Sequence, residues 1–526
     1  PGGIYRLRKR PPRACGLNMQ LLKLINGLAQ GSVQGPLDLE ITGIAYDSRK
    51  VVPGGLFVAV SGHQLDGHRF VGQALAQGAV AVAAEQELPQ VPAAVARITV
   101  PDSREALAHL AAAFYDFPAK KLHLIGITGT NGKTTTAYLL ESILKASGIR
   151  VGVLGTIEYR SGSRVWPAPV TTPESLDLQY YLSEMVRAGV THAVLEVSSH
   201  ALEQGRCRGL NFEVGVFTNL TRDHLDYHQN MEAYYQAKAK LFFHYLGETA
   251  FTPGTRAIIN RDDPFGDRLW AEAAVSKRDY GMEKDTAYRP LSVHSGFQGT
   301  QAQIQTPRGV SQVDSPLIGR HNIYNFLAAW AVGEALHLPT KGLQVGIRSL
   351  DKVPGRMEPV PNPKDLSILV DYAHTPEALR FALTSLKELT WKKIITVFGC
   401  GGDRDATKRP HMGQIAAEFS RLAIITSDNP RSEDPLKIID QIEAGVREQK
   451  MRPHDPAALT QVPDHPGYTV IPDRREAIRR AVQWAGPREV ILIAGKGHEN
   501  VQLVGDRILP FDDRLEALKA VEASLV

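Results

Sequence analysis

The segment 126–136, GITGTNGKTTT, contains the residues of this chain with the most specific chemical pattern. Glycines such as Gly129 and Gly132 let backbone N–H groups close around phosphate oxygens, and a helix that follows them adds a positive field. In such a loop Lys133 reaches the β- and γ-phosphates, and Thr134 places its hydroxyl on Mg²⁺. The segment therefore predicts a site for a nucleoside triphosphate.

The loop departs from the strict phosphate-loop pattern at one position. That pattern has glycine where this chain has Ile127, and the glycines stand at 126 and 129 instead. A plain glycine-rich turn is the alternative interpretation. Gly-Lys-Thr-Thr at a junction between a strand and a helix favours phosphate binding.

Two charged residues stand inside apolar segments. Glu196 interrupts the run AVLEV, and a buried carboxylate is costly unless it is paired or binds a metal. The alternative is an edge strand with Glu196 in water. Lys238 lies in MEAYYQAKAKLFF, where its neighbours three and four positions away are two tyrosines, a leucine and a phenylalanine. Lys238 is therefore expected on an apolar stripe, and the alternative is a lysine that extends its ammonium to solvent.

Alternating strands and helices must position these residues. The apolar run at 122–128 enters the glycine-rich loop, a helix follows until Gly148, and further strands are expected at 151–156, 191–199 and 213–219. This order predicts an α/β fold with a largely parallel sheet. Expected elements elsewhere are a small α/β unit at 19–118, a β appendage at 290–315, a helix at 319–336, a linker at 351–360 and strands at 393–400, 422–428 and 489–497. Ligands are expected at the carboxyl ends of the strands.

Bulk properties exclude several classes of protein. A length of 526 residues implies two to four domains, and a net charge of +4 argues against a long nucleic-acid surface. Three scattered cysteines suit a reducing cytoplasm, and the sequence contains no apolar run long enough for a membrane span. Residues 1–18 are basic and are expected to form an extension outside the fold.

The loop spelling G-x-x-G-T-N-G-K-T resembles that of the Mur ligase family, and further matches follow in order. They are TTPES (171–175), EVSSHALEQGR (196–206), TNLTRDHLDYH (218–228), GRHNIYN (319–325), PGRME (354–358), DYAHTP (371–376), GCGGDRD (399–405), DNPR (428–431) and GKGHE (495–499). The resemblance covers roughly residues 30–515, and it is strongest to the branch that adds the third peptide residue to the peptidoglycan precursor.

The resemblance implies three domains and an ATP-dependent ligation in the cytoplasm. The expected domains are 19–118, which binds the UDP end of the substrate, 119–350, a P-loop parallel sheet that binds ATP, and 351–526, a Rossmann-like domain that binds the amino acid. The reaction would join meso-diaminopimelate to UDP-MurNAc-L-Ala-D-Glu through an acyl phosphate. The partners would be these small molecules alone, with no nucleic acid and no membrane, and the chain would act as a monomer.

The resemblance also assigns catalytic, metal and nucleotide residues. Lys133, Glu196, His224 and Lys238 would be catalytic, and Thr134, Glu196, His224 and Lys238 would hold Mg²⁺, with Lys238 carbamylated to N6-carboxylysine. A part-buried lysine with a lowered pKa reacts with CO₂ more readily. The expected ATP contacts are Gly129, Thr130, Asn131, Gly132, Lys133, Thr134, Thr135, Asn322, Arg356, Asp371 and His374.

The two other substrates have their own expected residues. The UDP-MurNAc-peptide would contact Tyr46, Ser48, His63, Gln64, Leu65, Thr171, Thr172, Ser198, Gln204 and Arg206. The diamino acid would contact Arg404, Asp428, Asn429, Pro430, Arg431, Gly495 and Glu499. Arg431 favours meso-diaminopimelate over lysine, since its planar fork suits a second carboxylate and Glu499 suits the distal ammonium. The alternative for DNPR is a surface turn.

Two rival functions remain. One is a ligase similar to folylpolyglutamate synthase, which the EVSSHALEQGR and DNPR segments disfavour. The other is a nucleotide-dependent binding or regulatory protein without catalysis. The presence of Lys133, Glu196 and Lys238 counts against it.

Overall fold

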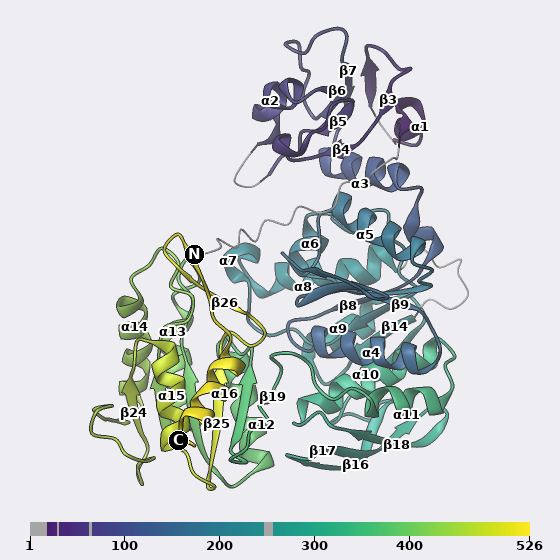
Figure 1. Ribbon diagram of the computed structural model, residues 1–526. Helices are drawn as coiled ribbons and strands as arrows, with labels where there is room; N and C mark the ends of the chain where they lie inside the picture. Colours follow the sequence, from purple (N-terminus) through teal and green to yellow (C-terminus); the bar gives the residue numbers. More distant parts are fainter. Residues whose placement is uncertain (1–17, 29–30, 63–65, 247–255, 526) are drawn as a thin grey trace.

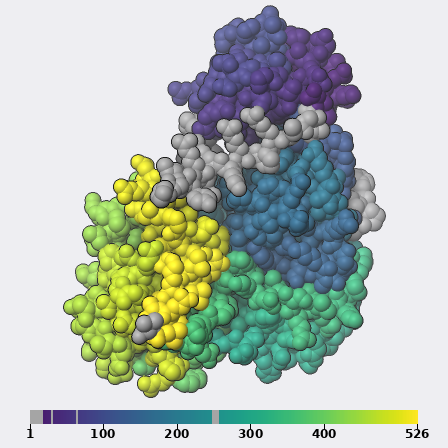
Figure 2. Space-filling model, in the orientation of Figure 1, coloured from purple at the N-terminus to yellow at the C-terminus, as the bar shows by residue number. Residues whose placement is uncertain are grey.

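The computed structural model describes residues 18–28, 31–62, 66–246 and 256–525. The strands of this part of the chain form three main sheets, one for each of three lobes (Figure 1). Figure 2 shows the N-terminal lobe beyond one end of the central lobe and the C-terminal lobe beside it. Most of the predicted extension at 1–18, and His63, Gln64 and Leu65, lie outside the described residues.

The N-terminal lobe is a small α/β unit, as predicted. Its five-stranded sheet has the order β2-β7-β6-β5-β4, and only β2 runs antiparallel to its neighbour. The strands are β2 (Ser32–Gln34), β4 (Ile44–Ala45), β5 (Gly55–Val58), β6 (Ala79–Ala84) and β7 (Ala96–Thr99), with β1 (Met19–Gln20) paired to β3 (Glu40–Ile41). The helices are α1 (Leu21–Ile25), α2 (Val71–Ala76) and α3 (Ser103–Phe114), with short turns η1 (Ser48–Lys50) and η2 (Gly67–Phe70).

The central lobe is built on an eight-stranded sheet with the order β11-β10-β9-β12-β8-β13-β14-β15. The six strands from β9 to β15 in this order are parallel, and β10 and β11 form an antiparallel edge. The strands are β8 (His123–Thr128), β9 (Val151–Leu154), β10 (Glu158–Ser161), β11 (Arg164–Pro167), β12 (His192–Glu196), β13 (Val214–Phe217), β14 (Arg256–Asn260) and β15 (Lys277–Tyr280). The predicted parallel sheet is therefore confirmed.

Helices cover both faces of this sheet. One apolar core joins the sheet to α4, α10 and α11, and a second core on the other face includes α5, α6 and α8. The helices are α4 (Lys133–Ala146), α5 (Ser175–Arg187), α6 (Ser199–Glu203), α7 (Leu225–His228), α8 (Met231–Lys240) with the turn η4 (Leu241–Tyr245), α9 (Pro264–Glu272), α10 (His321–Ala335) and α11 (Thr340–Arg348), with η3 (Pro118–Lys121) before β8. The β appendage is the antiparallel sheet β16 (Arg289–Gly296), β17 (Gly299–Thr306) and β18 (Gly309–Ser315).

The C-terminal lobe has a seven-stranded sheet with the order β19-β20-β25-β21-β22-β24-β23, parallel except for β19. Its strands are β19 (Glu358–Pro359), β20 (Ser367–Asp371), β21 (Lys393–Phe398), β22 (Leu422–Ile425), β23 (Arg452–Pro453), β24 (Gly467–Val470) and β25 (Glu489–Ala494). Its helices are α12 (Pro376–Leu389), α13 (Lys408–Phe419), α14 (Pro435–Glu448), α15 (Arg474–Trp484) and α16 (Asp513–Ala523), with the hairpin β26 (Val501–Val504) and β27 (Arg507–Pro510).

The chain crosses from the central to the C-terminal lobe through the PGRME segment. Gly355 has a φ of 65°, and a Cβ there would collide with the backbone nitrogen of His498. Tyr372 N donates to Gly355 O at 2.9 Å, which ties the crossing to the end of β20. No helix in the described part of the chain is both long enough and apolar enough to cross a membrane.

Candidate functional site

The phosphate loop connects β8 to α4 and has the backbone that its glycines predict. Gly129 and Gly132 have φ values of 141° and 89°, and a Cβ on Gly129 would collide with Thr218 Oγ1. Lys133 Nζ donates to the carbonyls of Gly129 and Thr130, both at 2.8 Å. The first N–H groups of α4 have no partner within the helix and provide an anion site.

Glu196 ends a central strand, so the alternative of an edge strand in water is wrong. β12 lies between β9 and β8, and Glu196 is 1% exposed. Its carboxylate accepts hydrogen bonds from Thr134 Oγ1 at 2.9 Å, Thr156 Oγ1 at 2.8 Å and Thr156 N at 2.9 Å. Hydroxyl and carboxylate oxygens thus converge beside the phosphate loop, and these are oxygen ligands of the kind that Mg²⁺ prefers.

Lys238 is buried on α8 directly behind the same loop. It is 1% exposed, and its Nζ donates to Gly129 O at 2.8 Å and lies 4.6 Å from the centre of the Tyr234 ring. Burial and the nearby Lys133 ammonium hold the pKa of Lys238 well below its usual range, against a weaker opposite effect of Asp223. The alternative of an ammonium in solvent is therefore wrong for Lys238. Lys240 behaves that way instead, since it pairs with Glu203 at 2.6 Å on the surface.

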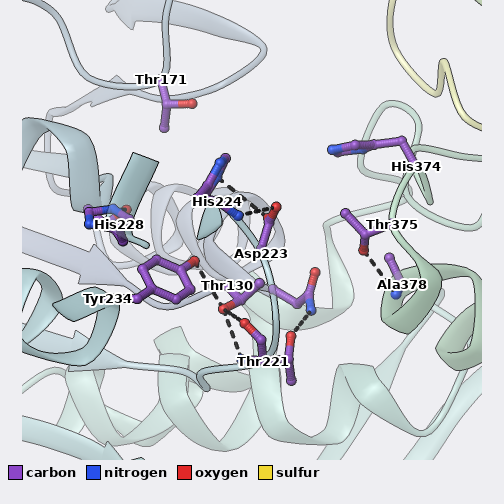
Figure 3. Close-up of polar contacts among 12 residues, drawn as sticks. Thr130, Thr171, Thr221, Asp223, His224, His228, Tyr234, His374, Thr375 and Ala378 are labelled. Atoms are coloured by element: carbon purple, nitrogen blue, oxygen red, sulfur yellow. Dashed lines mark hydrogen bonds and ion pairs between the residues drawn. The ribbon is translucent and has the colours of Figure 1, made fainter. Parts of the chain in front are cut away.

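His224 and Asp223 stand between the loop and the C-terminal lobe. Figure 3 shows His224 beside Asp223, with Tyr234 and Thr130 on one side and His374 and Thr375 on the other. His224 has a φ of 53°, its N donates to Asp223 Oδ1 at 2.8 Å, and its Nε2 lies 3.5 Å from Asp223 Oδ2. Burial lowers the pKa of His224, which keeps an imidazole lone pair available.

A cavity of about 490 Å³ opens over the phosphate loop and extends to the C-terminal lobe. It is lined by Thr130, Asn131, Gly132, Lys133, Thr134 and Thr135 of the predicted nucleotide set, together with Arg356, Asp371 and His374. The Arg356 guanidinium lies 4.9 Å from the Tyr372 ring centre, and its Nη2 donates to Thr134 Oγ1 at 3.4 Å. Burial raises the pKa of Asp371, whose Oδ2 accepts from Met357 N at 2.7 Å.

Of the predicted nucleotide set, Gly129 and Asn322 do not line the cavity, and the contacts of Asn322 explain its place. Its Nδ2 donates to Ile318 O at 2.7 Å and its Oδ1 accepts from Asn325 Nδ2 at 2.9 Å, so its amide is used inside the protein. Asn322 does not line the cavity, whereas Asn325 and Tyr324 of the same helix do. The structure therefore brings Asn325, rather than Asn322, to the cavity wall.

A second cavity of about 730 Å³ lies against the C-terminal lobe. Six of the seven residues predicted for the diamino acid line it: Arg404, Asp428, Asn429, Arg431, Gly495 and Glu499. Pro430 does not line it, and its carbonyl packs against Gly402. These residues follow β21, β22 and β25, so the carboxyl ends of three parallel strands meet here as predicted.

Arg431 is held in a fixed orientation by this loop cluster. Its φ is 53°, its N donates to Leu503 O at 3.0 Å, and its Nη1 donates to Gly402 O at 2.6 Å. Among the described residues, Nε and Nη2 of Arg431 have no hydrogen-bond partner. The fork therefore keeps donors for a ligand carboxylate.

The two cavities share a boundary. Asp223, His224, Tyr372, His374, Thr375 and Glu377 line both. A phosphoryl group held over the loop and an amine held in the second cavity would thus meet beside Asp223 and His224.

Comparisons with known proteins agree with this layout. Family models described as "Mur ligase family, catalytic domain", "Mur ligase middle domain" and "Mur ligase, glutamate ligase domain" match residues 40–115, 127–333 and 355–497. A protein of Geobacter metallireducens named UDP-N-acetylmuramoyl-L-alanyl-D-glutamate--2,6-diaminopimelate ligase is 46% identical over 502 residues, which cover 95% of this chain and 98% of that protein. The chain belongs to the Mur ligase family.

Other Mur ligases support the same assignment. A protein of Geobacillus thermodenitrificans with the same name is 42% identical over 505 residues, which cover 96% of this chain and 99% of that protein. A solved structure of a UDP-N-acetylmuramoyl-L-alanyl-D-glutamate--2,6-diaminopimelate ligase has a TM-score of 0.63 at 33% identity, and it covers 92% of this chain and 96% of that one. The predicted family and the three-domain α/β fold are confirmed.

In this Mur ligase, the residues predicted for the peptide substrate form a hydrogen-bonded group near Glu196. Thr172 Oγ1 donates to Glu196 O at 2.8 Å and accepts from Ser198 N at 3.0 Å, and Arg206 Nη1 donates to Thr172 O at 2.9 Å. Gln204 Oε1 accepts from Arg206 Nε at 2.9 Å. Thr171 is joined to the group through Thr156 Oγ1 at 3.2 Å.

Two other residues predicted to contact the UDP-MurNAc-peptide, Tyr46 and Ser48, lie in the N-terminal lobe. Tyr46 OH donates to Asp177 Oδ2 of the central helix α5 at 2.7 Å, and Ser48 Oγ donates to Gln73 Oε1 at 2.8 Å. Tyr46 therefore links the two lobes of the ligase.

Several residues of the site were not predicted from the sequence. Thr156 supplies two of the three hydrogen bonds to the Glu196 carboxylate, and Asp223 lines both cavities. Tyr372 joins Arg356 to the second cavity. For Asp223 a signal was present, because it precedes His224 in the TRDHLD segment. Thr156 gave none, since a threonine at the end of a strand is common.

The low pKa of a buried histidine near the site predicts that the protein loses stability in acid. His228 is 5% exposed, stacks on Tyr234 and bonds to Ser199 Oγ at 2.9 Å, and burial with nearby cationic groups lowers its pKa to about 4. An unfolded histidine has a pKa of about 6.5, so the unfolded chain binds more protons between these values. We expect the urea midpoint to fall as pH drops from 6.5 to 4, and His228→Gln to show a shallower fall. An equal slope in that variant would contradict the assignment to His228.

Proposed function

We propose that this chain is the ATP-dependent ligase that joins meso-diaminopimelate to UDP-MurNAc-L-Ala-D-Glu. The observation that carries the proposal is the shared wall at Asp223 and His224, where a phosphate-loop cavity meets a cavity lined by the Arg431 guanidinium and the Glu499 carboxylate. ATP would phosphorylate the γ-carboxylate of D-Glu, and the amine would displace phosphate from the acyl phosphate. The relatives that carry this ligase name over nearly their whole length support the same assignment.

We infer that Mg²⁺ is held by Thr134, Glu196, His224 and carbamylated Lys238. Among the described residues no three His, Cys, Asp or Glu side chains form a ready metal cage. That suits Mg²⁺, which usually takes one or two protein carboxylates together with waters and substrate phosphates. The ion would offset the repulsion between the triphosphate and the attacking carboxylate.

Lys238 is proposed to carry a carbamate, as N6-carboxylysine. Burial lowers the pKa of this amine, which favours its uncharged form, and the uncharged amine is the form that attacks CO₂. Attack on CO₂ with loss of one proton from the nitrogen would give a carboxylate beside Gly129 of the phosphate loop. Its negative charge would be balanced by the nearby Lys133 ammonium and the metal ion.

The chain's own residues would hold and orient the nucleotide. Lys133 would leave the carbonyls of Gly129 and Thr130 and bind the β- and γ-phosphates. Arg356 lies in the segment 351–360 between the lobes. When the C-terminal lobe closes, its guanidinium would add positive charge beside Thr134. The proposed ATP contacts are Gly129, Thr130, Asn131, Gly132, Lys133, Thr134, Thr135, Arg356, Asp371 and His374, with Asn322 orienting Asn325 behind them.

The substrate ends are proposed to bind in separate lobes. The N-terminal lobe, residues 19–118, would hold the uridine diphosphate at Tyr46 and Ser48. The central lobe, residues 119–350, would hold the muramoyl peptide at Thr171, Thr172, Ser198, Gln204 and Arg206. The C-terminal lobe, residues 351–526, would hold the diamino acid, with its distal carboxylate on Arg404 and Arg431 and its distal ammonium on Glu499 and Asp428.

We also propose that the enzyme acts in the cytoplasm as a monomer. The thiols of Cys207 and Cys400 are buried and free, which suits a reducing compartment.

Phosphate release is the direct test of the proposed function. We expect release that depends on ATP, UDP-MurNAc-L-Ala-D-Glu and meso-diaminopimelate together, and a tripeptide product in the mass spectrum. A folate with glutamate tests the rival ligase, and we expect no release with it. Phosphate at background level with all three substrates would contradict the ligase, and faster release with L-lysine would contradict the choice of diamino acid.

A further inference from the structure

A buried lysine behind the amino-acid cavity has no role in the function proposed above. Lys496 follows β25 and Gly495 and is 0% exposed. It does not line the cavity, yet its Nζ lies 3.1 Å from Asn429 Oδ1, 3.2 Å from Glu499 Oε2 and 3.7 Å from Asp428 Oδ1. All three of these residues line the cavity, so Lys496 supports its wall from behind.

The bonds of Lys496 fix the orientation of the Asn429 amide. Asn429 Oδ1 accepts from Lys496 Nζ and from Leu503 N, the latter at 3.0 Å. Because both donors require the amide oxygen, Nδ2 must point the other way, and it donates to Glu499 Oε2 at 2.8 Å. The lysine and the amide therefore hold the same oxygen of Glu499.

This arrangement leaves one oxygen of Glu499 for a ligand. Within the described residues Glu499 Oε1 accepts no hydrogen bond, whereas Asp428 Oδ1 is buried and lies 3.7 Å from Lys496 Nζ. In the same part of the chain, Lys496 is the one cationic side chain within 4 Å of either carboxylate. Two neighbouring carboxylates in a protein wall need such a counter-charge, since uncompensated buried charge is costly.

We propose that Lys496 is a specificity-determining positioning residue for the distal ammonium of the diamino acid. It joins Asp428, Asn429 and Glu499 into one acidic wall and leaves Glu499 Oε1 to accept from the ligand. Arg431 meanwhile keeps its free donors for the ligand carboxylate. The inference rests on the proposed function and adds a residue that acts through Glu499 without touching the substrate.

The test compares Lys496→Met, which keeps the length of the side chain and removes its charge, with the wild-type enzyme. We expect the KM for meso-diaminopimelate to rise at least about tenfold, while the KM for ATP, the KM for the UDP-dipeptide and kcat change less than about threefold. We also expect weaker discrimination against 2-aminopimelate, which lacks the distal amine. Lys496→Gln retains N–H donors, so its KM for meso-diaminopimelate should lie between those of the wild type and Lys496→Met.

The matched control is Lys519→Met. Lys519 lies on α16 of the same lobe, pairs with Glu516 at 2.9 Å on the surface and lies outside both cavities. We expect wild-type constants for all three substrates in this variant.

Each outcome separates the two proposals. An active wild-type enzyme with an unchanged or uniformly changed set of KM values in Lys496→Met would overturn the role of Lys496 and leave the proposed function standing. Loss of cooperative thermal unfolding in both Lys496 variants would make the residue part of the lobe's core and would also overturn it. A wild-type enzyme without turnover would contradict the proposed function itself.

Discussion

Replacing Lys238 with alanine should lower kcat at least about 1,000-fold, which is about 4 kcal/mol in activation free energy. The variant removes the buried amine beside Gly129 that we propose carries the carbamate. Without that carboxylate, Lys133 and the metal ion would lack one of their proposed counter-charges. Phosphate release at saturating substrate concentrations measures the effect.

Short carboxylates should restore part of the activity of Lys238→Ala. Alanine leaves the volume of the lysine side chain empty between Tyr234 and Gly129. Acetate or formate fits that space and supplies the same kind of oxygen ligand as a carbamate. We expect recovery that saturates with carboxylate concentration, and none with chloride at equal ionic strength.

Lys240→Ala is the matched control, because Lys240 lies two positions further along the same segment of α8. Its ammonium pairs with Glu203 on the surface rather than with the phosphate loop. Its kcat should equal that of the wild-type enzyme. Full activity in Lys238→Ala, with a thermal midpoint near that of the wild type, would rule out the proposed role of Lys238.

The sequence predicted the elements of the site where local pattern and burial agree. The phosphate loop follows from Gly129 and Gly132, whose left-handed backbone only glycine adopts easily. The burial of Glu196 and Lys238 follows from their apolar neighbours, since a strand or a helix places such neighbours on one face. These signals depend on residues close in the chain.

The rest depends on contacts between segments distant in the chain. Thr156 meets Glu196 from a loop 40 positions earlier, and Arg356 meets Thr134 across 222 positions. Neither pairing leaves a period or a spacing in the sequence. Asn322 and Asn325 lie three positions apart on the same face of α10, so the helical period does not choose between them. The Asn322 amide bonds to Ile318 O and to Asn325, whereas Asn325 lines the cavity. The contacts of Lys496 with Asp428 and Asn429 are likewise distant in the chain, so the sequence did not single out Lys496 within GKGHE.

Arg431→Ala should lower kcat/KM for meso-diaminopimelate roughly 100-fold or more, about 3 kcal/mol. The change removes a guanidinium whose Nε and Nη2 have no partner in the described part of the protein and which lines the amino-acid cavity. A ligand carboxylate would then be desolvated without its fork, which costs more than the loss of one neutral hydrogen bond. Arg431→Lys keeps the positive charge but loses the planar pair of donors, so it should recover only part of the lost kcat/KM.

The comparison that decides the role of Arg431 is with L-lysine, which has the distal ammonium but no second carboxylate. Arg431→Ala should leave kcat/KM for L-lysine nearly unchanged. The preference for meso-diaminopimelate over L-lysine, measured as the ratio of the two kcat/KM values, should then fall by the whole loss for meso-diaminopimelate. Arg447→Ala on α14 is the control, since Arg447 pairs with Glu443 at 2.8 Å on the surface and lies outside the cavity. Equal losses for both amino acids would mean that Arg431 shapes the loop through Gly402 O and does not read the second carboxylate. Selectivity would then have to come from Arg404, whose Nη1 donates to Asp403 O at 3.1 Å and whose side chain is exposed at the cavity mouth.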